Sequence, residues 1–302
     1  MKTTSHTILF ALALVSALAL VSGFAYAADQ CSVSDVLQHA TVRIETQQNG
    51  KTKVGTGFYY MFSNNVPALV TCRHIVEDAE VGRLFFSPAE KSSPHEQSAA
   101  VIPVDVPNFA AACIPHPDEA VDLAIFPLGP LLKQRESLGK QQIYITPLSA
   151  ANIPNSDSLK RLGSFTDVKV IGYPIGIRDA LNYQPICRSG IMATDPNTNY
   201  NGQPQFLIDA ATFPGSSGSP VLVAHDGVYS FQGQGYVGRR LFLLGILFAT
   251  HEYNNNGDVS LRTIPAALQT GEATGNPSNL GIVIKARELD AFEKLLEQIM
   301  NP

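Results

Sequence analysis

The chain is poor in basic residues. Its 302 residues include 21 lysines and arginines against 26 aspartates and glutamates, which gives a formal net charge of −5. Non-specific nucleic-acid binding needs a basic surface that displaces counterions from phosphates, so this composition argues against a nucleic-acid-binding protein. Hydrophobic residues make up 45% of the chain and charged residues 16%, which is typical of a globular protein.

Long apolar runs are absent after the N-terminus. The longest one, Ile8–Val21, has 14 residues and is too short to span a bilayer. It follows Lys2 and precedes Ala25–Ala27, a small-x-small cleavage site, so residues 1–27 are predicted to be a secretory signal peptide. The alternative is an uncleaved N-terminal anchor. We expect an exported protein, periplasmic or extracellular, that does not contact the membrane after signal cleavage.

Cysteines are few and dispersed. Cys31, Cys72, Cys113 and Cys187 include no Cys-x-x-Cys pair, which argues against a zinc site. No metal or cofactor is expected. In an oxidising compartment these cysteines can form disulfides, in three possible full pairings among which the sequence does not choose. Some of them can equally be buried free thiols.

Most of the remaining chain is predicted to form short strands between turns. Asn201-Gly202 and Asp226-Gly227 are typical turn pairs, and many short strands at close spacing favour an all-β barrel or sandwich. The predicted strands are Ala40–Thr46, Gly55–Phe62, Val66–Thr71, Ala99–Val106, Leu123–Phe126, Gln142–Pro147, Asp167–Gly172, Gln184–Thr194, Gln205–Ala210, Pro220–Ala224, Tyr229–Gln234 and Leu241–Thr250.

A helix is predicted at the C-terminus, with an apolar stripe that should dock on a barrel. Its apolar residues recur at helical spacing: Leu289, Phe292, Leu295, Leu296 and Ile299. The stretch Leu128–Ser164 is expected to be irregular and is the best linker candidate. We therefore expect an N-terminal domain over residues 28–150 and a C-terminal domain, including the helix, over residues 151–302.

Three short segments carry residues typical of nucleophilic catalysis. The strand Leu69–Thr71 leads into His74, and Asp122 opens the apolar run Leu123–Ile125. Ser217 lies in a glycine-flanked stretch before another strand. Each segment alone also fits a structural role, but Asp122 comes 48 residues after His74 and Ser217 comes 95 residues later still. The order His, Asp, Ser is that of the chymotrypsin-type arrangement and differs from those of subtilisins and α/β-hydrolases.

The chain resembles the trypsin-like (chymotrypsin-fold) serine proteases, and more closely the bacterial exported branch that includes the high-temperature-requirement proteases. The matching segments are Gly55–Phe58, Thr71–His74, Asp122–Ile125, Ile208–Ala211, Pro214–Pro220 and Leu244–Ile246. The resemblance implies an all-β fold of two six-stranded antiparallel β-barrels, with the active site in the crevice between them. The peptide-binding PDZ domain that often follows in this branch is not expected, because only the terminal helix comes after Ile284.

The resemblance also implies a role for each residue of a His74–Asp122–Ser217 triad. Ser217 is the expected nucleophile, His74 the general base, and Asp122 the group that orients the imidazole. The backbone N–H groups of Gly215 and Ser217 are expected to form the oxyanion hole. Ser216 stands where digestive-type members carry aspartate, so the usual zymogen switch looks absent and activity is expected once the signal peptide is removed.

Other candidates within the motifs fit less well. Asp118 lacks the apolar run that follows Asp122, and Ser216 and Ser219 lack the glycine spacing around Ser217. The remaining histidines of the mature chain have no matching context and are expected to be surface or turn residues: His39, His95, His116, His225 and His251.

The resemblance predicts a pocket for the substrate side chain that precedes the cut. Ala211, six residues before the nucleophile, is expected at its base, and Leu247, Phe248 and Ala249 are expected in another wall. A cationic side chain buried there would have no anionic partner, and an unpaired buried charge costs on the order of several kcal/mol of free energy. We therefore expect cleavage after Ala, Val, Leu or Met, unless a shifted register brings Asp209 into the pocket.

The sequence thus predicts a secreted or periplasmic serine endopeptidase that acts on protein or peptide substrates. One alternative is a catalytically silent trypsin-like domain that binds peptides or a protein partner in the same crevice. Another is an esterase on a different fold, against which the His-Asp-Ser order and the lack of strand–helix alternation argue.

Overall fold

The computed structural model describes residues 32–89, 101–179, 183–231, 233–253, 259–263 and 276–300. The predicted signal peptide, Cys31 and His95 lie outside these residues. Within this part of the chain, no helix is both long and apolar enough to cross a membrane.

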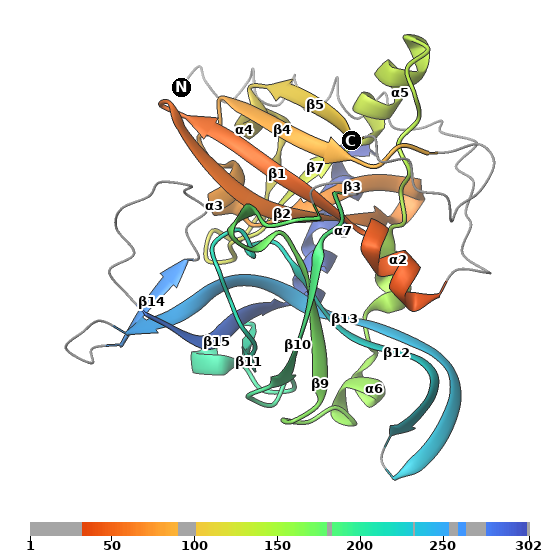
Figure 1. Cartoon of the computed structure of the whole chain (residues 1–302), viewed down its shortest axis with the longest axis vertical. Helices are drawn as coiled ribbons and strands as arrows, with labels where there is room; N and C mark the ends of the chain where they lie inside the picture. The colour runs from red at the N-terminus through yellow and green to blue at the C-terminus, as the bar shows by residue number, and fades with distance from the viewer. Residues whose placement is uncertain are drawn as a thin grey trace.

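The fold is mostly β, with two sheets that follow one another along the chain (Figure 1). The first sheet contains β1 (Thr41–Gln48), β2 (Lys51–Phe62), β3 (Val66–Thr71), β4 (Val81–Phe86), β5 (Ile102–Pro107), β6 (Ile114–Pro115), β7 (Ala124–Pro127) and β8 (Leu148–Ser149). The second contains β9 (Asp167–Gly172), β10 (Ile186–Met192), β11 (Gln205–Asp209), β12 (Pro220–Phe231), β13 (Gln234–Tyr253), β14 (Val259–Thr263) and β15 (Asn276–Lys285).

The second sheet closes into a ring of six antiparallel strands. Its order is β12-β9-β10-β11-β15-β13, and pairing of β13 with β12 completes the ring, while β14 adds to the outer edge of β13. The interior is filled by fully buried side chains such as Val168, Phe206 and Val223. The six-stranded antiparallel barrel predicted for the C-terminal half is therefore present.

The first sheet differs from the expected six-stranded barrel. It has eight strands in the order β5-β4-β1-β2-β3-β7-β6, with β8 paired in parallel with β2, and no described pairing joins β5 to β6. The strand β4 was not predicted. The predicted strand Gln142–Pro147 is not formed, because this segment contributes only one bridge, between Ile143 and Pro88.

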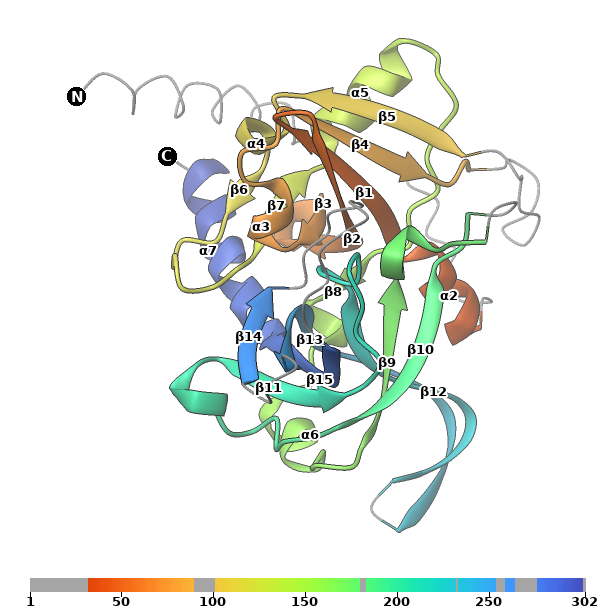
Figure 2. The ribbon, with the colours of Figure 1, turned by 60° about the vertical axis from the view of Figure 1, so that its left-hand side comes forward.

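A long hairpin of β12 and β13 projects from the barrel (Figures 1 and 2). The predicted turn at Asp226-Gly227 is wrong, because pairing continues through Gly227 and Gly238 as far as Phe231 and Gln234. Both glycines have positive φ, of 90° and 142°, and they face each other across the ladder. Gly227 thus accommodates a local distortion within a continuous hairpin and does not mark the point where the chain reverses.

The helices are short except at the C-terminus. They are α2 (Val33–His39), α3 (Arg73–Val76), α4 (Phe109–Ala112), α5 (Gly129–Ser137), α6 (Ser156–Lys160) and α7 (Leu289–Met300), with 3₁₀ turns at Ser63–Asn65, Ala150–Asn152, Pro174–Gly176, Tyr200–Gly202 and Ala286–Glu288. The stretch expected to be irregular, Leu128–Ser164, thus contains α5 and α6.

The predicted C-terminal helix, α7, is confirmed, and it makes contacts with residues of the first sheet. The Phe292 ring lies 6.3 Å from the Phe62 ring and 5.3 Å from the His116 ring. The carboxylate of Glu293 accepts a hydrogen bond from Ser63 N at 2.9 Å. The last helix of the chain therefore ties the C-terminal half back to the N-terminal half.

Candidate active site

His74 and Asp122 are brought together by the pairing of β3 with β7. The fully buried strand β3 ends at Thr71, whose register partner in β7 is Ala124. His74 follows β3 in the single turn α3, and Asp122 precedes β7. Two residues that are 48 positions apart in the chain are thereby held side by side, at the same end of two paired strands.

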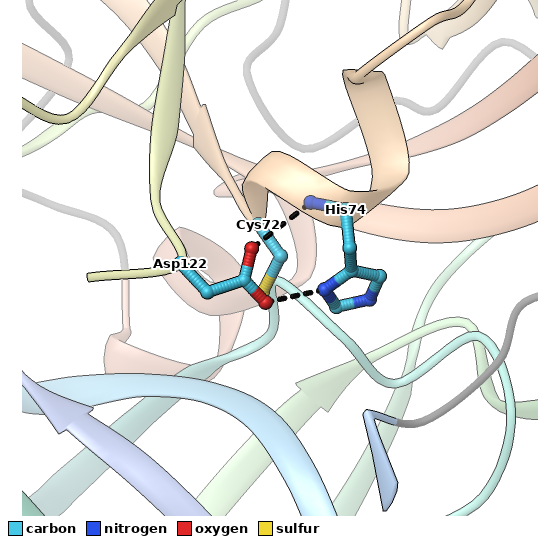
Figure 3. A group of neighbouring side chains, drawn as sticks. All are labelled: Cys72, His74 and Asp122. Carbon is cyan, nitrogen blue, oxygen red and sulfur yellow. Dashed lines mark hydrogen bonds and ion pairs between the residues drawn. The ribbon is translucent and has the colours of Figure 1, made fainter. Parts of the chain in front are cut away.

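One carboxylate fixes both the backbone and the ring of His74 (Figure 3). Asp122 Oδ1 accepts a hydrogen bond from His74 N at 2.9 Å, and Oδ2 lies 2.5 Å from His74 Nδ1. Each of the two side chains is 16% exposed. Since an ionised carboxylate only accepts hydrogen bonds, the proton of the neutral ring is assigned to Nδ1. Nε2 then carries the lone pair, and this buried atom has no hydrogen-bond partner among the described residues.

Ser217 lies in the loop between β11 and β12 and is fully buried. Its hydroxyl donates a hydrogen bond to the carbonyl of Phe248 in β13, at 3.3 Å. Gly215 and Gly218 flank it with φ of 88° and 86°, a conformation that favours glycine. A Cβ on Gly218 would lie 1.9 Å from the carbonyl oxygen of Thr56, so a larger residue does not fit there.

The loop around Ser217 is held by backbone groups of both halves. Thr56 in β2 donates its N–H to the carbonyl of Ser217 and its hydroxyl to the carbonyl of Gly215, both at 2.9 Å. The carbonyl of Pro214 accepts a hydrogen bond from Ile175 N. Because the C=O and N–H of a trans peptide point in opposite directions, the N–H of Gly215 points away from Ile175.

Cys72 lies between the two parts of the site, a position that the sequence analysis did not assign to it. Its thiol donates to the carbonyl of Leu247 at 3.5 Å, and Gly218 N donates to the same oxygen at 2.8 Å. Its sulfur also lies within 4.8 Å of the ligand atoms of His74 and Asp122 (Figure 3). These contacts connect the histidine and aspartate of the first half with the serine loop of the second.

The same three side chains, Cys72, His74 and Asp122, offer ligand types that metal ions bind. Burial raises the pKa of the Cys72 thiol, and the negative charge of Asp122 raises it further. Metal ligation by cysteine needs the thiolate, and Asp122 already holds Nδ1 of the imidazole. The cluster is therefore suited to hydrogen bonding rather than to metal binding.

The two walls of the predicted side-chain pocket lie next to each other. Thr212 Oγ1 donates to Thr250 Oγ1 at 2.9 Å, and both residues are fully buried. Their neighbours Leu247, Phe248 and Ala249 are buried in β13, and Ala211 is half-buried. Asp209 lies in β11 and is exposed. The hydroxyl pair was not predicted, since neither threonine belongs to a recognisable motif.

The outer edge of β13 next to the serine carries another strand of this chain. Ala249 pairs with Thr263 and Thr250 with Arg262, so β14 runs antiparallel along the edge that continues from Phe248. An extended peptide that adds a strand to a sheet needs an edge whose backbone groups are unpaired. The backbone groups nearest to Ser217 are thus already partly engaged within the chain.

The prediction that the other histidines are surface or turn residues is wrong for His116. This side chain is buried, with Nε2 3.2 Å from the carbonyl of Glu288 and its ring against Phe292. It therefore belongs to the contact between the first sheet and α7. Of the described cysteines, Cys72 and Cys113 are buried free thiols and Cys187 is an exposed free thiol.

Solved structures similar to the chain include two proteases, whereas no curated protein matches it. The HtrA-type protease AlgW, solved with a tripeptide, has a TM-score of 0.47 and 16% identity, over 89% of this chain and 64% of the AlgW chain. Rv3671c from M. tuberculosis H37Rv, in an inactive form, has a TM-score of 0.42 and 15% identity, over 92% of this chain and 98% of its own. This chain thus spans just under two thirds of the AlgW chain.

The family model described as "Trypsin-like peptidase domain" matches residues 55–229 of the chain. The matched stretch is more than half of the 302-residue chain and includes His74, Asp122 and Ser217. The family resemblance inferred from the motifs is confirmed: the chain belongs to the family of trypsin-like peptidase domains.

Proposed function

We propose that this chain is an exported serine endopeptidase that cleaves protein or peptide substrates through His74, Asp122 and Ser217. The observation that carries the proposal is the pair of hydrogen bonds that the Asp122 carboxylate accepts from His74, from its backbone N–H and from Nδ1, with Nε2 of the imidazole left as a base. A structural histidine needs no carboxylate that fixes its tautomer in this way. The fully buried Ser217, in a loop that requires glycine on both sides, supplies the nucleophile.

The chemistry follows from the groups at the site. Ser217 Oγ turns from the carbonyl of Phe248 towards Nε2 of His74, gives up its proton and attacks the carbonyl carbon of the substrate. Asp122 stabilises the imidazolium that forms, and the imidazolium then protonates the leaving amine. An acyl-enzyme remains on Ser217. Water deprotonated by the same imidazole hydrolyses it.

The backbone N–H groups of Gly215 and Ser217 form the oxyanion hole in this proposal. The orientation of the Pro214–Gly215 peptide, with its carbonyl turned to Ile175, supports this role for Gly215. Donors that are oriented before the reaction stabilise the developing negative charge without reorganisation, and one such donor typically contributes about 3 kcal/mol to lowering the barrier.

Ala211, Leu247, Phe248 and Ala249 line the proposed substrate pocket. The Thr212–Thr250 hydroxyl pair supports an uncharged interior, because neither side chain carries a negative charge that would pair with a cation. We therefore propose cleavage after small or medium apolar residues. Export to the periplasm or the extracellular space is proposed from residues 1–27 alone.

The competing function is a catalytically silent domain that binds peptides in the same crevice. The pairing of β14 with the edge of β13 favours it, because this strand limits access for an extended substrate. A labelled fluorophosphonate separates the two functions. We expect stoichiometric labelling of residues 28–302 at Ser217, no labelling of Ser217→Ala, and hydrolysis of a peptide library read by mass spectrometry. Unlabelled protein with no cleavage products would support the silent domain.

A further inference from the structure

Ser216, the residue before the proposed nucleophile, is fully buried, and its hydroxyl has an arginine as partner. Arg188 Nη2 in β10 donates to Ser216 Oγ at 2.7 Å. The guanidinium also lies 5.8 Å from the centre of the Phe213 ring, and the carbonyl of Phe213 accepts a hydrogen bond from Ser216 N at 3.0 Å. Arg188 thus contacts the loop that carries Gly215 at two residues.

This arginine lacks a counter-ion among the described residues. Its Nε and Nη1 are buried without a hydrogen-bond partner in the described part of the chain, and burial lowers the pKa of Arg188 to about 10. A desolvated cation without a paired carboxylate destabilises a fold. A methionine or leucine would fill the same space without this cost, so packing alone does not account for an arginine.

Rotation of the Pro214–Gly215 peptide would turn the N–H of Gly215 away from the reacting carbonyl. The carbonyl of that peptide accepts a hydrogen bond from Ile175 N, and the carbonyl of the next peptide, that of Gly215, accepts one from Thr56 Oγ1. On the other side the chain continues into Ser216, whose position depends on Arg188. Hydrogen bonds on both sides of Gly215 thus favour one orientation of its N–H before any substrate binds.

We propose that Arg188 is a positioning residue that holds the loop 213–219 in its catalytically competent conformation through Ser216. The inference rests on the proposed function and adds that this chain forms its oxyanion hole without a newly cut N-terminus. The partly buried guanidinium of Arg188, supplied by β10, replaces the charged group that a maturation cut would create.

Arg188→Met tests the proposal, with Lys169→Met as the matched control. Lys169 lies on the neighbouring strand β9, and its amine donates to Ser189 Oγ on the exposed side of β10 at 2.7 Å. At a temperature where circular dichroism shows all proteins folded, we expect Arg188→Met to lower kcat by about tenfold to a hundredfold with little change in KM. Lys169→Met should leave kcat unchanged, and Arg188→Lys, which keeps one donor, should retain more activity than Arg188→Met.

Hydrogen exchange gives a readout that does not depend on activity. We expect the amides of Ser216, Gly218 and Ser219, which donate to backbone carbonyls, to exchange faster in Arg188→Met than in the wild type and in Lys169→Met. Unchanged exchange together with a kcat within about twofold of the wild type would overturn the proposal. If the wild type hydrolyses nothing, the proposed function fails, and the exchange data alone decide whether Arg188 positions the loop.

Discussion

The two halves of this protein position their reacting groups in different ways. In the N-terminal half, side chains hold one another: Asp122 fixes the backbone and the ring of His74 after the pairing of β3 and β7 has brought them together. In the C-terminal half, the backbone itself is held, by hydrogen bonds to the carbonyls around Ser217 and by two glycines with positive φ. An imidazole has to be oriented as a ring, whereas an oxyanion hole is made of N–H groups.

This difference has a consequence for substitutions. Changes of polar side chains in the N-terminal half should reduce activity and leave the fold intact. An added Cβ in the serine loop of the C-terminal half should disturb the fold itself.

Ser217→Ala removes the nucleophile while its surroundings stay in place. If Ser217 is the nucleophile, we expect kcat to fall by about 10⁶, as when the triad of a serine protease is disabled, with a nearly unchanged melting temperature. Ser216→Ala is the neighbouring control and should lose far less, about tenfold to a hundredfold, through the loop. Steady-state turnover of a peptide substrate measures both. Near wild-type turnover of Ser217→Ala with loss in Ser216→Ala would reverse the assignment of the nucleophile.

Asp122→Asn tests whether the N-terminal half acts through side-chain orientation. The asparagine oxygen can still accept the N–H of His74, so the turn α3 should stay intact. Its amide group favours the wrong tautomer of the ring, for which a loss of about 10⁴ in kcat is known from other triads. Turnover and thermal unfolding measured on the same sample separate the two effects. A large drop in melting temperature would show that Asp122 supports the fold rather than the ring.

Gly218→Ala tests the backbone-based half. A Cβ there would lie 1.9 Å from the carbonyl oxygen of Thr56, at a φ of 86°. We expect the free energy of unfolding to fall by about 3 kcal/mol or more. Gly139→Ala is the control, because its φ of 62° is also positive but no atom lies within 4 Å of the added Cβ. That variant should lose only about 1 kcal/mol in urea unfolding. Similar losses in both variants would remove the steric argument.

Substrate preference tests the pocket of the C-terminal half. Matched peptides that differ only in the residue before the cut should give a higher kcat/KM for Ala, Val, Leu or Met than for Arg or Lys. The reason is that the described walls contain apolar side chains and the Thr212–Thr250 pair, with Asp209 exposed on β11. A preference of tenfold or more for Arg or Lys, about 1.4 kcal/mol of transition-state binding, would contradict this pocket.

The stability of the protein should depend slightly on pH through Glu288, which lies next to the start of α7. Burial raises the pKa of this carboxyl, although His116 opposes the shift. A raised folded-state pKa means that the contribution to stability is present at low pH and is lost as the pH rises through that pKa. We therefore expect Glu288→Gln to match the wild type near pH 4 and to be more stable at pH 7, by less than about 1 kcal/mol. Urea unfolding at both pH values measures this difference, and equal stability at pH 7 would contradict it.

Much of the candidate site was predictable because its residues belong to contiguous motifs. Asp122 and the apolar run behind it, and Ser217 with its glycines, are local patterns that a sequence displays directly. Arg188 and Cys72 were not predictable in this way. Their contacts, to Ser216 and to Leu247, join segments that are 28 and 175 residues apart, and no local pattern indicates such a pair.

The fold shows the same division. The apolar periodicity of the last helix predicted α7, and alternating short apolar runs predicted most strands, because both patterns repeat within a few residues. The turn at Asp226-Gly227 failed because a cross-strand pair with Gly238 decided the local conformation. The eight strands of the first sheet likewise depend on which edges are left to pair, a property of the assembled sheet.

The sequence contains the groups on which the proposed chemistry depends: His74, Asp122 and Ser217 in that order, the glycines beside the serine, and an uncharged residue at Ala211. How these groups are held became visible only in the folded chain: one carboxylate is bound twice to His74, Thr56 comes from the opposite half, Arg188 comes from β10, and β14 lies on the edge of β13. The physical reason is that residue types specify which reactions are possible, whereas orientation depends on hydrogen bonds between segments that only folding brings within reach.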